Sequence, residues 1–281
     1  MSVDAATGIL SAMRHIVHSI IGLCLLVVVH VPTAGSAQPA PSRLEAVRRA
    51  NELRVCVWPA YFAISYLNPR TNRLEGIDID LAEQFAADLG VRATFVDTSF
   101  VRFMDDLDSD RCDVAMFSVG VTQERSQRVA FSAPYLRSDI YAVTTKSQKR
   151  IKAWKDIDEP GVVVAVQRGT YMEPLMKRLL KQAEILSVAS PQTREAEIQS
   201  GRADVFISDY PYTRRMLLFY DWTLVIEAPA PISPTDYAYA VKKGDPEWLA
   251  RVDAFVAAIK QDGRLARAAA RHGLSAIVVG P

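Results

Sequence analysis

Three polar residues follow short apolar stretches, each at a point where a strand is expected to end. Arg125 comes after DVAMF, Thr170 follows GVVVAVQ in the sequence RGT, and Asp209 ends ADVFISD. A guanidinium binds a carboxylate through two parallel hydrogen bonds, and a hydroxyl near a helix start can bind the same anion. An aspartate carries the opposite charge, which suits an ammonium group. Together the three residues predict a pocket for an α-amino acid.

Each of these residues also has a purely structural explanation. Arg125 could pair with its neighbour Glu124, while Thr170 and Asp209 could simply cap the helices that follow them. Taken singly, these explanations are at least as good as ligand binding. The occurrence of all three residues at strand ends, in both halves of the chain, favours the binding interpretation.

Alternating strands and helices must position these residues. Strands are predicted at 53–58, 93–98, 113–117, 140–145, 161–167, 184–189, 203–209 and 236–244, and helices at 80–90, 101–109, 172–182, 193–201, 211–220, 246–263 and 264–273. Asp80 is expected to cap the first of these helices, with Glu83 completing a capping box and Gly90 ending it. The segments 66–76 and around Arg125 are expected to be loops.

This order of elements predicts an α/β protein with two lobes, since strands that alternate with helices form parallel sheets. The chain is expected to cross between lobes near residues 137–141 and to return near 231–236. The predicted organisation is therefore 43–137 for lobe 1, 138–232 for lobe 2, and 233–281 for the return to lobe 1. Ligands bind beyond the carboxyl ends of parallel strands, where the three polar residues lie.

The first 37 residues have the layout of a secretory signal peptide. Arg14 precedes an apolar run at 16–31, and the small residues 33–37 follow it, so cleavage is expected after Ala37 and export to the periplasm with it. A membrane anchor is the alternative, but His18 and His30 interrupt the run. Translation could begin at Met1 or at Met13.

Composition excludes several classes of function. The 281 residues carry a formal net charge of +1, which does not suggest nucleic acid or a polybasic membrane surface as a partner. After signal removal only His272 remains, which argues against histidine metal sites and most Ser/His or Cys/His catalysis, and no cofactor is expected. His272 follows a helical run, where a cation complements the helix end. Cys56 and Cys112 could form a disulfide in an oxidising compartment or remain buried thiols.

The chain resembles the amino-acid-binding periplasmic proteins of ABC transporters, extracellular solute-binding proteins of family 3. The resemblance covers nearly all of the exported chain and is carried by LRVCVWPAY, LEGIDIDLAEQFAADLG, DVAMFSVGVTQERSQRVAFSAPYL, VQRGT and ADVFISDYP. It implies a type II periplasmic binding protein fold, in which two mostly parallel sheets flanked by helices are joined by a two-strand hinge. It also implies a monomer that passes a small amino acid or related carboxylate to a membrane permease.

The family's ligand-binding positions can be carried over residue by residue. They fall on Arg125 in TQER for the α-carboxylate, Gly169 and Thr170 for the same group, Asp209 for the amine, and Tyr61 and Phe100 for the side chain. Two positions depart from the family pattern. Gly120 stands where a serine or threonine usually helps to hold the carboxylate, so only its backbone could contribute, and Phe117 replaces a small residue. A ligand other than a standard amino acid is therefore compatible with the sequence.

Two other functions share this fold. Cyclohexadienyl dehydratase, which the chain resembles at GIDIDLAEQFAADLG and FSAPYLR, uses a glutamate three residues after the glycine of the G-T pair as its general acid. That position is Met172 here, and Glu173 is one residue too far along, so catalysis would need an adjusted loop. The other function is a receptor that reports its ligand to a membrane sensor, and its pocket would be the same.

Overall fold

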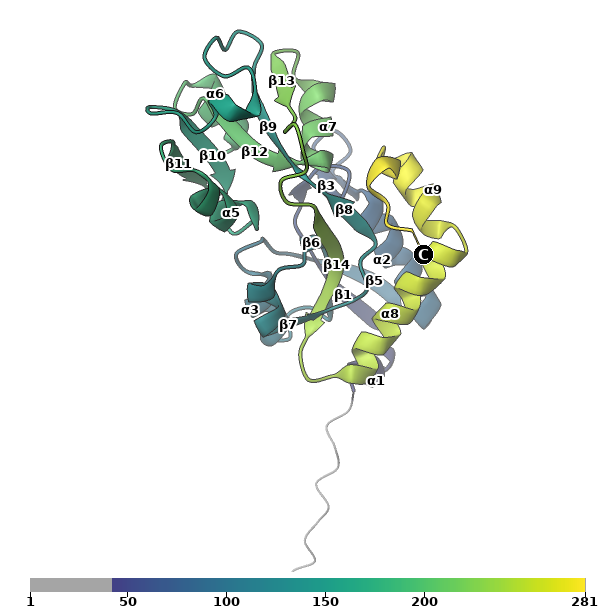
Figure 1. The fold of residues 1–281 in the computed structure, drawn as a ribbon. Helices are drawn as coiled ribbons and strands as arrows, with labels where there is room; N and C mark the ends of the chain where they lie inside the picture. The colour runs from purple at the N-terminus through teal and green to yellow at the C-terminus, as the bar shows by residue number, and fades with distance from the viewer. Residues whose placement is uncertain (1–41, 281) are drawn as a thin grey trace, which may run out of the picture. The chain divides into compact units, whose positions relative to one another are not determined.

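A computed structural model describes residues 42–280, which form two α/β lobes (Figure 1). The strands of lobe 1 are β1 (Glu52–Val57), β5 (Arg92–Asp97), β6 (Val114–Gly120), β7 (Val129–Phe131), β8 (Leu136–Ser138) and β14 (Thr235–Lys242). They form one six-stranded sheet with the order β5-β1-β6-β14-β7, and β8 pairs with β14. The predicted signal peptide, residues 1–37, and both candidate start methionines lie outside the described residues.

Lobe 2 is built on a second, five-stranded sheet. Its strands are β9 (Ile140–Thr145), β10 (Val163–Gln167), β11 (Glu184–Val188), β12 (Val205–Asp209) and β13 (Thr223–Ile226), in the order β11-β10-β12-β9-β13. Three neighbouring strands pair in parallel in each lobe, namely β5-β1-β6 in lobe 1 and β11-β10-β12 in lobe 2. The remaining strands of each sheet pair antiparallel. The parallel part is as predicted. The antiparallel edges arise where the chain enters or leaves a lobe.

Helices accompany both sheets. Lobe 1 has α1 (Arg43–Ala50), α2 (Ile77–Leu89), α3 (Phe103–Asp108), α4 (Gln123–Arg128), α8 (Pro246–Gln261), α9 (Arg264–Arg271) and the 3₁₀ turn η2 (Ser275–Ile277). Lobe 2 has η1 (Trp154–Asp156), α5 (Met172–Leu179), α6 (Arg194–Gln199) and α7 (Tyr210–Phe219). Within the described part of the chain, none of the helices combines the length and apolar character that crossing a membrane requires.

The core of lobe 1 lies between its sheet and the helices α2 and α8. Phe85 of α2 packs against Trp248 and Phe255 of α8, with ring centroids 5.6 Å and 4.6 Å apart. Every residue of β6 is buried, as expected for a central strand covered on both faces. Lobe 2 has its own cluster, which includes Phe206 of β12 and Met216 of α7.

Helix α2 begins three residues earlier than predicted. Gly76, not Asp80, is its N-cap. Its φ of 140° and the 2.3 Å that would separate a Cβ from the carbonyl oxygen of Ile64 both require glycine. Asp80 lies inside the helix and pairs instead with Arg271 and His272 at the end of α9. Gly90 ends the helix in the left-handed conformation, as predicted.

Two predicted loops contain secondary structure. The expected loop at 66–76 belongs to a small sheet of β2 (Ala60–Tyr61), β3 (Ser65–Asn68) and β4 (Arg73–Glu75), whose strands are too short to show alternation in the sequence. Arg125, also expected in a loop, lies in the short helix α4, which Thr122 caps by accepting a hydrogen bond from the Arg125 N–H at 3.2 Å.

The two segments that connect the lobes lie side by side. Strands β8 and β14 pair antiparallel, with Ser138 opposite Thr235. The carboxylate of Asp139 then accepts hydrogen bonds from the N–H groups of Ile232 at 2.9 Å and Ser233 at 2.8 Å, which ties the outgoing segment to the returning one. This paired connection is the two-strand hinge of the predicted fold, although the lobe boundaries near residues 137 and 232 stay a prediction.

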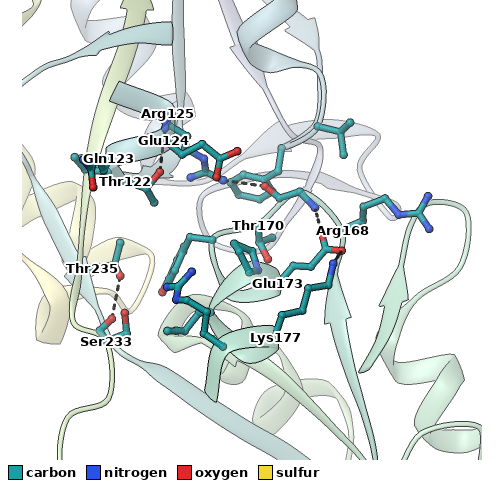
Figure 2. Close-up of a pocket in the computed structure, with 18 of the residues that line it drawn as sticks. Thr122, Gln123, Glu124, Arg125, Arg168, Thr170, Glu173, Lys177, Ser233 and Thr235 are labelled. Carbon is teal, nitrogen blue, oxygen red and sulfur yellow. Dashed lines mark hydrogen bonds and ion pairs between the residues drawn. The ribbon is translucent and has the colours of Figure 1, made fainter. Parts of the chain in front are cut away.

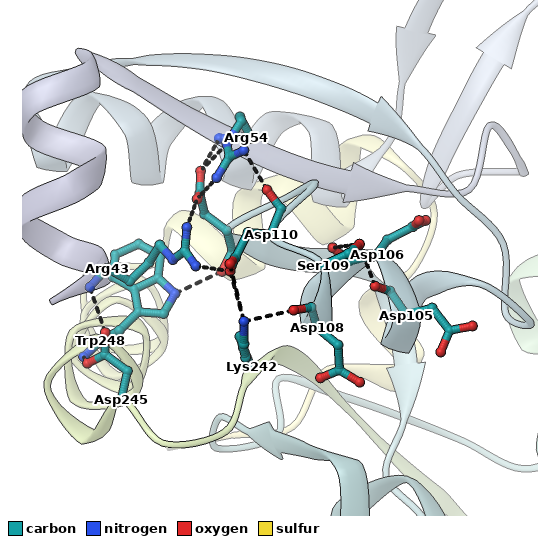
Figure 3. Close-up of polar contacts among 11 residues, drawn as sticks. Arg43, Arg54, Asp105, Asp106, Asp108, Ser109, Asp110, Lys242, Asp245 and Trp248 are labelled. Carbon is teal, nitrogen blue, oxygen red and sulfur yellow. Dashed lines mark hydrogen bonds and ion pairs between the residues drawn. The ribbon is translucent and has the colours of Figure 1, made fainter. Parts of the chain in front are cut away.

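Covalent and ionic contacts secure the start of lobe 1. Cys56 and Cys112 form a disulfide, with their Cα atoms 5.6 Å apart. Beside it, the buried carboxylate of Asp113 accepts hydrogen bonds from the guanidinium of Arg54 at 2.7 Å and from that of Arg43 at 3.2 Å. Figure 3 shows Arg43 and Arg54 converging on the segment after α3. Helix α1, which the sequence analysis did not predict, is thereby attached to the sheet.

Candidate ligand-binding cleft

Arg125 lies where the two lobes meet. Its guanidinium donates hydrogen bonds to the backbone oxygen of Gly120 in lobe 1 at 2.7 Å and to that of Gly169 in lobe 2 at 2.9 Å. The rings of Phe100 and Phe103 lie 5.6 Å and 5.5 Å from the guanidinium carbon, within range of a cation–π contact. The side chain is therefore held in place by backbone oxygens and aromatic faces alone.

Arg125 forms no ion pair among the described residues. The residue is only 5% exposed, and none of the ion pairs formed among residues 42–280 includes it, so the expected alternative of a pair with Glu124 is wrong. Burial lowers the pKa of Arg125 to about 10, which still leaves it charged at neutral pH. Buried charges are usually paired, so a desolvated guanidinium without a carboxylate is suited to an anionic ligand.

Gly169 lies close to the backbone of lobe 1. Its φ is 79°, and a Cβ at this position would lie 2.7 Å from Val101 Cγ2 and 2.9 Å from the Val101 nitrogen. Both the left-handed conformation and the close approach require glycine. The glycine of the RGT motif thus lets the start of α5 reach the loop between β5 and α3.

Thr170 follows at the same contact and is buried. Its hydroxyl donates a hydrogen bond to the carbonyl oxygen of Gln167 at 2.8 Å, and Tyr171 is the N-cap residue of α5. The alternative that Thr170 only caps the helix is therefore wrong. The hydroxyl would have to rotate away from Gln167 to donate to a bound anion.

Asp209 ends β12 and is held by two tyrosines of lobe 1. One carboxylate oxygen accepts hydrogen bonds from the hydroxyls of Tyr61 and, at 2.8 Å, Tyr237, and the other accepts from the Tyr212 N–H at 3.3 Å as the N-cap of α7. A carboxylate offers about four acceptor positions, so one remains for an N–H donor. Burial and the neighbouring Asp209 charge raise the pKa of Tyr61 well above its ordinary value, so both hydroxyls stay protonated donors.

Aromatic rings form one wall of the site. Tyr61 and Phe100 contact each other edge to face with centroids 5.8 Å apart, and Trp58 packs on both at 5.6 Å and 5.2 Å. Phe117 supports Phe100 from the sheet side at 5.1 Å. The unexpected phenylalanine at position 117 is thus a core residue behind the wall. It does not line the cavity.

Gly120 is explained by a neighbour in the other lobe. A Cβ at Gly120 would lie 2.9 Å from Cδ1 of Tyr171 and 3.2 Å from Cγ2 of Thr235. The ring of Tyr171 therefore occupies the space that a serine or threonine at position 120 would need. Glycine at position 120, where the family usually has serine or threonine, thus leaves room for the ring of Tyr171.

Two cavities adjoin these residues. An open cleft of about 1030 Å³ is lined by Arg125 and Gly169, and Figure 2 shows Arg125 and Glu173 among its lining residues. An inner cavity of about 20 Å³, room for about one water molecule, is lined by Tyr61, Gly120 and Asp209. The residues shared by both cavities are Phe100, Thr170 and Tyr171. These three residues therefore border both the open cleft that contains Arg125 and the inner cavity that contains Asp209.

Glu173 is oriented away from the inner cavity. Its carboxylate accepts hydrogen bonds from the Gly169 N–H at 3.0 Å, Lys177 at 3.0 Å and Ser187 at 2.9 Å. Partial burial acts to raise the pKa of Glu173, but these three donors outweigh it and the pKa lies below its usual value. Met172 lines the inner cavity instead. Glu173 is therefore placed away from the inner cavity, as the one-residue offset predicted, and its lowered pKa makes it a poor proton donor.

Several cavity residues were not predicted from the sequence. Arg194 begins α6 after β11, so the same strand-end rule that identified Arg125 would have found it. Tyr237 and Tyr171 could not be found in this way, since Tyr237 comes from the returning strand and Tyr171 matters through its contact with Gly120. None of the described residues forms a cluster of three or more metal-ligating side chains.

Comparisons with known proteins agree on one family. The model of the bacterial extracellular solute-binding proteins, family 3, matches residues 53–275. Cyclohexadienyl dehydratase of Pseudomonas aeruginosa is 29% identical over 255 residues, which are 90% of this chain and 92% of the dehydratase. The L-cystine-binding protein TcyJ of Escherichia coli K12 is 28% identical over 194 residues, 69% of this chain and 72% of that protein.

Solved structures agree with this assignment. The ancestral amino acid-binding protein AncCDT-1, described as a precursor of cyclohexadienyl dehydratase, superposes with a TM-score of 0.74 at 30% identity, over 82% of this chain and 99% of that one. A putative ABC transporter binding component of Wolinella succinogenes, complexed with lysine, gives 0.71 at 29% identity, over 79% and 95%. The fold is that of the type II periplasmic binding proteins. The chain belongs to the bacterial extracellular solute-binding proteins of family 3.

Proposed function

We propose that the protein binds a small α-amino acid between its lobes in the periplasm and delivers it to the permease of an ABC transporter. The observation that carries this proposal is the buried, unpaired guanidinium of Arg125 at the contact between the lobes. A ligand carboxylate would replace the backbone oxygens as its partner. Gly120 and Thr170 would border the carboxylate, and Asp209 would accept a hydrogen bond from the amine.

Lobe movement is part of this proposal. The inner cavity of about 20 Å³ is far smaller than an amino acid, so a ligand enters only when the lobes separate and the ring of Tyr171 moves. Because the ligand then contacts both lobes, it favours the closed arrangement over the open one. Closure would be the signal that a membrane partner recognises.

A dehydratase is the second candidate, favoured by the similarity to the Pseudomonas aeruginosa enzyme over nearly the full chain. That reaction needs a proton donor beside the leaving hydroxyl. Against it stand the low pKa of Glu173 and its three hydrogen bonds outside the inner cavity. These features support the binding function over the catalytic one.

The experiment that tests the proposal is a thermal-shift screen of refolded protein against the amino acids and against prephenate. Refolding removes any retained ligand, and a ligand that binds only the native state raises the melting temperature. Stabilisation by an amino acid without turnover is expected. Stabilisation by prephenate with release of product would establish the dehydratase instead.

A further inference from the structure

A second arginine lines the inner cavity from lobe 2. Arg194, the first residue of α6, is only 3% exposed, and one of its terminal nitrogens donates hydrogen bonds to the backbone oxygen of Ile207 and to Ser208 Oγ, both at 3.0 Å. Its guanidinium carbon lies 4.0 Å from the ring centroid of Tyr212, which holds it in a fixed orientation. Arg194 therefore projects into the site as a rigid, desolvated cation.

No direct ion pair neutralises this cation within the part of the chain that the structure describes. Its Nε is buried and has no acceptor, and it forms no ion pair with any carboxylate among residues 42–280. The adjacent Glu195 does not pair with it: one Glu195 oxygen accepts hydrogen bonds from Tyr212 at 2.7 Å and Arg215 at 2.6 Å, and the other is buried without a hydrogen-bond partner among the described residues. By contrast, the exposed Arg202, just after the same helix, forms an ion pair with Glu197 at 2.6 Å.

The position of Arg194 relative to Asp209 indicates which ligand group would bind to Arg194. Ser208, which Arg194 contacts, directly precedes Asp209, and both arginine and aspartate line the same cavity. The site thus presents a cation at Arg125, an anion at Asp209 and a second cation at Arg194. An α-amino acid with an acidic side chain carries the complementary sequence of charges, namely α-carboxylate, ammonium and side-chain carboxylate.

We propose that the ligand is an α-amino acid with an acidic side chain, and that Arg194 binds the side-chain carboxylate. This inference rests on the proposed binding function and narrows its ligand class. The guanidinium offers free N–H donors in a planar arrangement that matches a carboxylate, and burial strengthens such charge-assisted bonds. An uncharged or cationic side chain would leave Arg194 buried without a carboxylate partner, and a cationic one would add repulsion.

Calorimetric titration of refolded protein with matched pairs tests the inference: L-glutamate against L-glutamine, and L-aspartate against L-asparagine. We expect the acid of at least one pair to bind roughly 10- to 100-fold more tightly than its amide, the range for hydrogen bonds to a charged group. Arg194→Gln should remove that preference while retaining binding of the amide, which also shows that the variant is folded. Arg194→Lys, which keeps the charge without the planar donors, should retain part of the preference for the acid over its amide.

Arg202→Gln is the matched control, because it makes the same chemical change at an exposed arginine of the same region and should leave the preference intact. Tighter binding of neutral or cationic amino acids, or a preference unchanged in Arg194→Gln, would overturn the inference while the amino-acid-binding function stands. If no amino acid binds and only acids without an amine do, the proposed function itself fails and the inference fails with it.

Discussion

The guanidinium of Arg125 in lobe 1 donates a hydrogen bond to the backbone oxygen of Gly169 in lobe 2, with a nitrogen–oxygen distance of 2.9 Å. The residue proposed to bind the ligand carboxylate is therefore also a contact between the lobes. A carboxylate that takes over this nitrogen would exchange a neutral acceptor for a charged one, which forms the stronger bond. Ligand binding and lobe closure are in this way expected to depend on the same side chain.

Arg125→Ala should weaken ligand binding by roughly 100-fold or more, because two hydrogen bonds to a charged group are lost. Calorimetric titration with the ligand from the thermal-shift screen measures this loss. Arg128→Ala in the same helix is the control, since Arg128 is exposed and pairs with Asp105 and Asp108 outside the cleft. An unchanged dissociation constant in Arg125→Ala would rule out the assignment.

Asp209→Asn should weaken binding of ligands that carry an amine by roughly 10- to 100-fold, because a charged acceptor for the ammonium is replaced by a neutral amide. Titration with the amino acid and with its 2-hydroxy analogue, which lacks the amine, separates the two effects. Asp236→Asn, at a residue that lines the open cleft but not the inner cavity, serves as the control. Equal losses for both ligands would argue against an amine-binding role for Asp209.

Gly169→Ala should impair closure, since the added Cβ would meet the Val101 backbone nitrogen at 2.9 Å. We expect weaker ligand binding and a larger radius of gyration in the presence of ligand, measured by small-angle X-ray scattering. Gly161→Ala is a matched control in the same lobe, because Gly161 has a φ of 73° but no neighbour within 4 Å of its Cβ position. Both variants place an alanine at a positive φ, but only Gly169→Ala also brings a Cβ against Val101. Equal effects on binding would mean that strain alone is responsible.

Gly120→Ser should weaken binding despite adding a hydroxyl, because its Cβ would lie 2.9 Å from the Tyr171 ring. Combining it with Tyr171→Ala should relieve the clash, so the double variant should bind more tightly than the two single effects predict. For residues in contact, such coupling is expected to be about 1 kcal/mol. A double-mutant cycle of dissociation constants measures it, and strict additivity would contradict the packing relationship.

Asp78 makes stability depend on pH. Burial raises its pKa to about 7, against the opposing effect of hydrogen bonds from Tyr135, Ser118 and Tyr239. Between the ordinary value of 3.8 and about 7, the folded state retains a proton that the unfolded state has lost. The contribution of Asp78 is thus fully present below this window and is lost as pH rises through it.

The difference in unfolding free energy between wild type and Asp78→Asn isolates this effect. Urea denaturation at pH 5 and pH 8 should show that wild type loses more stability than the variant over this interval, by a few kcal/mol in order of magnitude. The asparagine keeps the shape of the side chain but has no proton to lose. Parallel pH dependences of the two proteins would show that Asp78 does not titrate in this window.

The sequence by itself determined the class of fold and the most local parts of the site. Apolar runs alternating with helical spacing predicted the longer strands of both lobes but missed β7, β8 and β13. Strand ends pointed to the candidate site residues Arg125, Thr170 and Asp209, because the position of a strand end is a local property. Local cues also failed where an element was short. Helix α4 has six residues, and strands β2 to β4 have two to four.

Only the tertiary structure decided which side chains meet across the lobes. The contacts of Arg125 with Gly169, Tyr171 with Gly120, and Tyr237 with Asp209 join residues from 28 to 51 positions apart. No pattern within one segment specifies such pairs, since they depend on how the two sheets are joined at the paired strands β8 and β14. The lack of an ion pair at Arg194 among the described residues is likewise a property of the folded chain, because Glu195, its neighbour in the sequence, pairs with Arg215 instead.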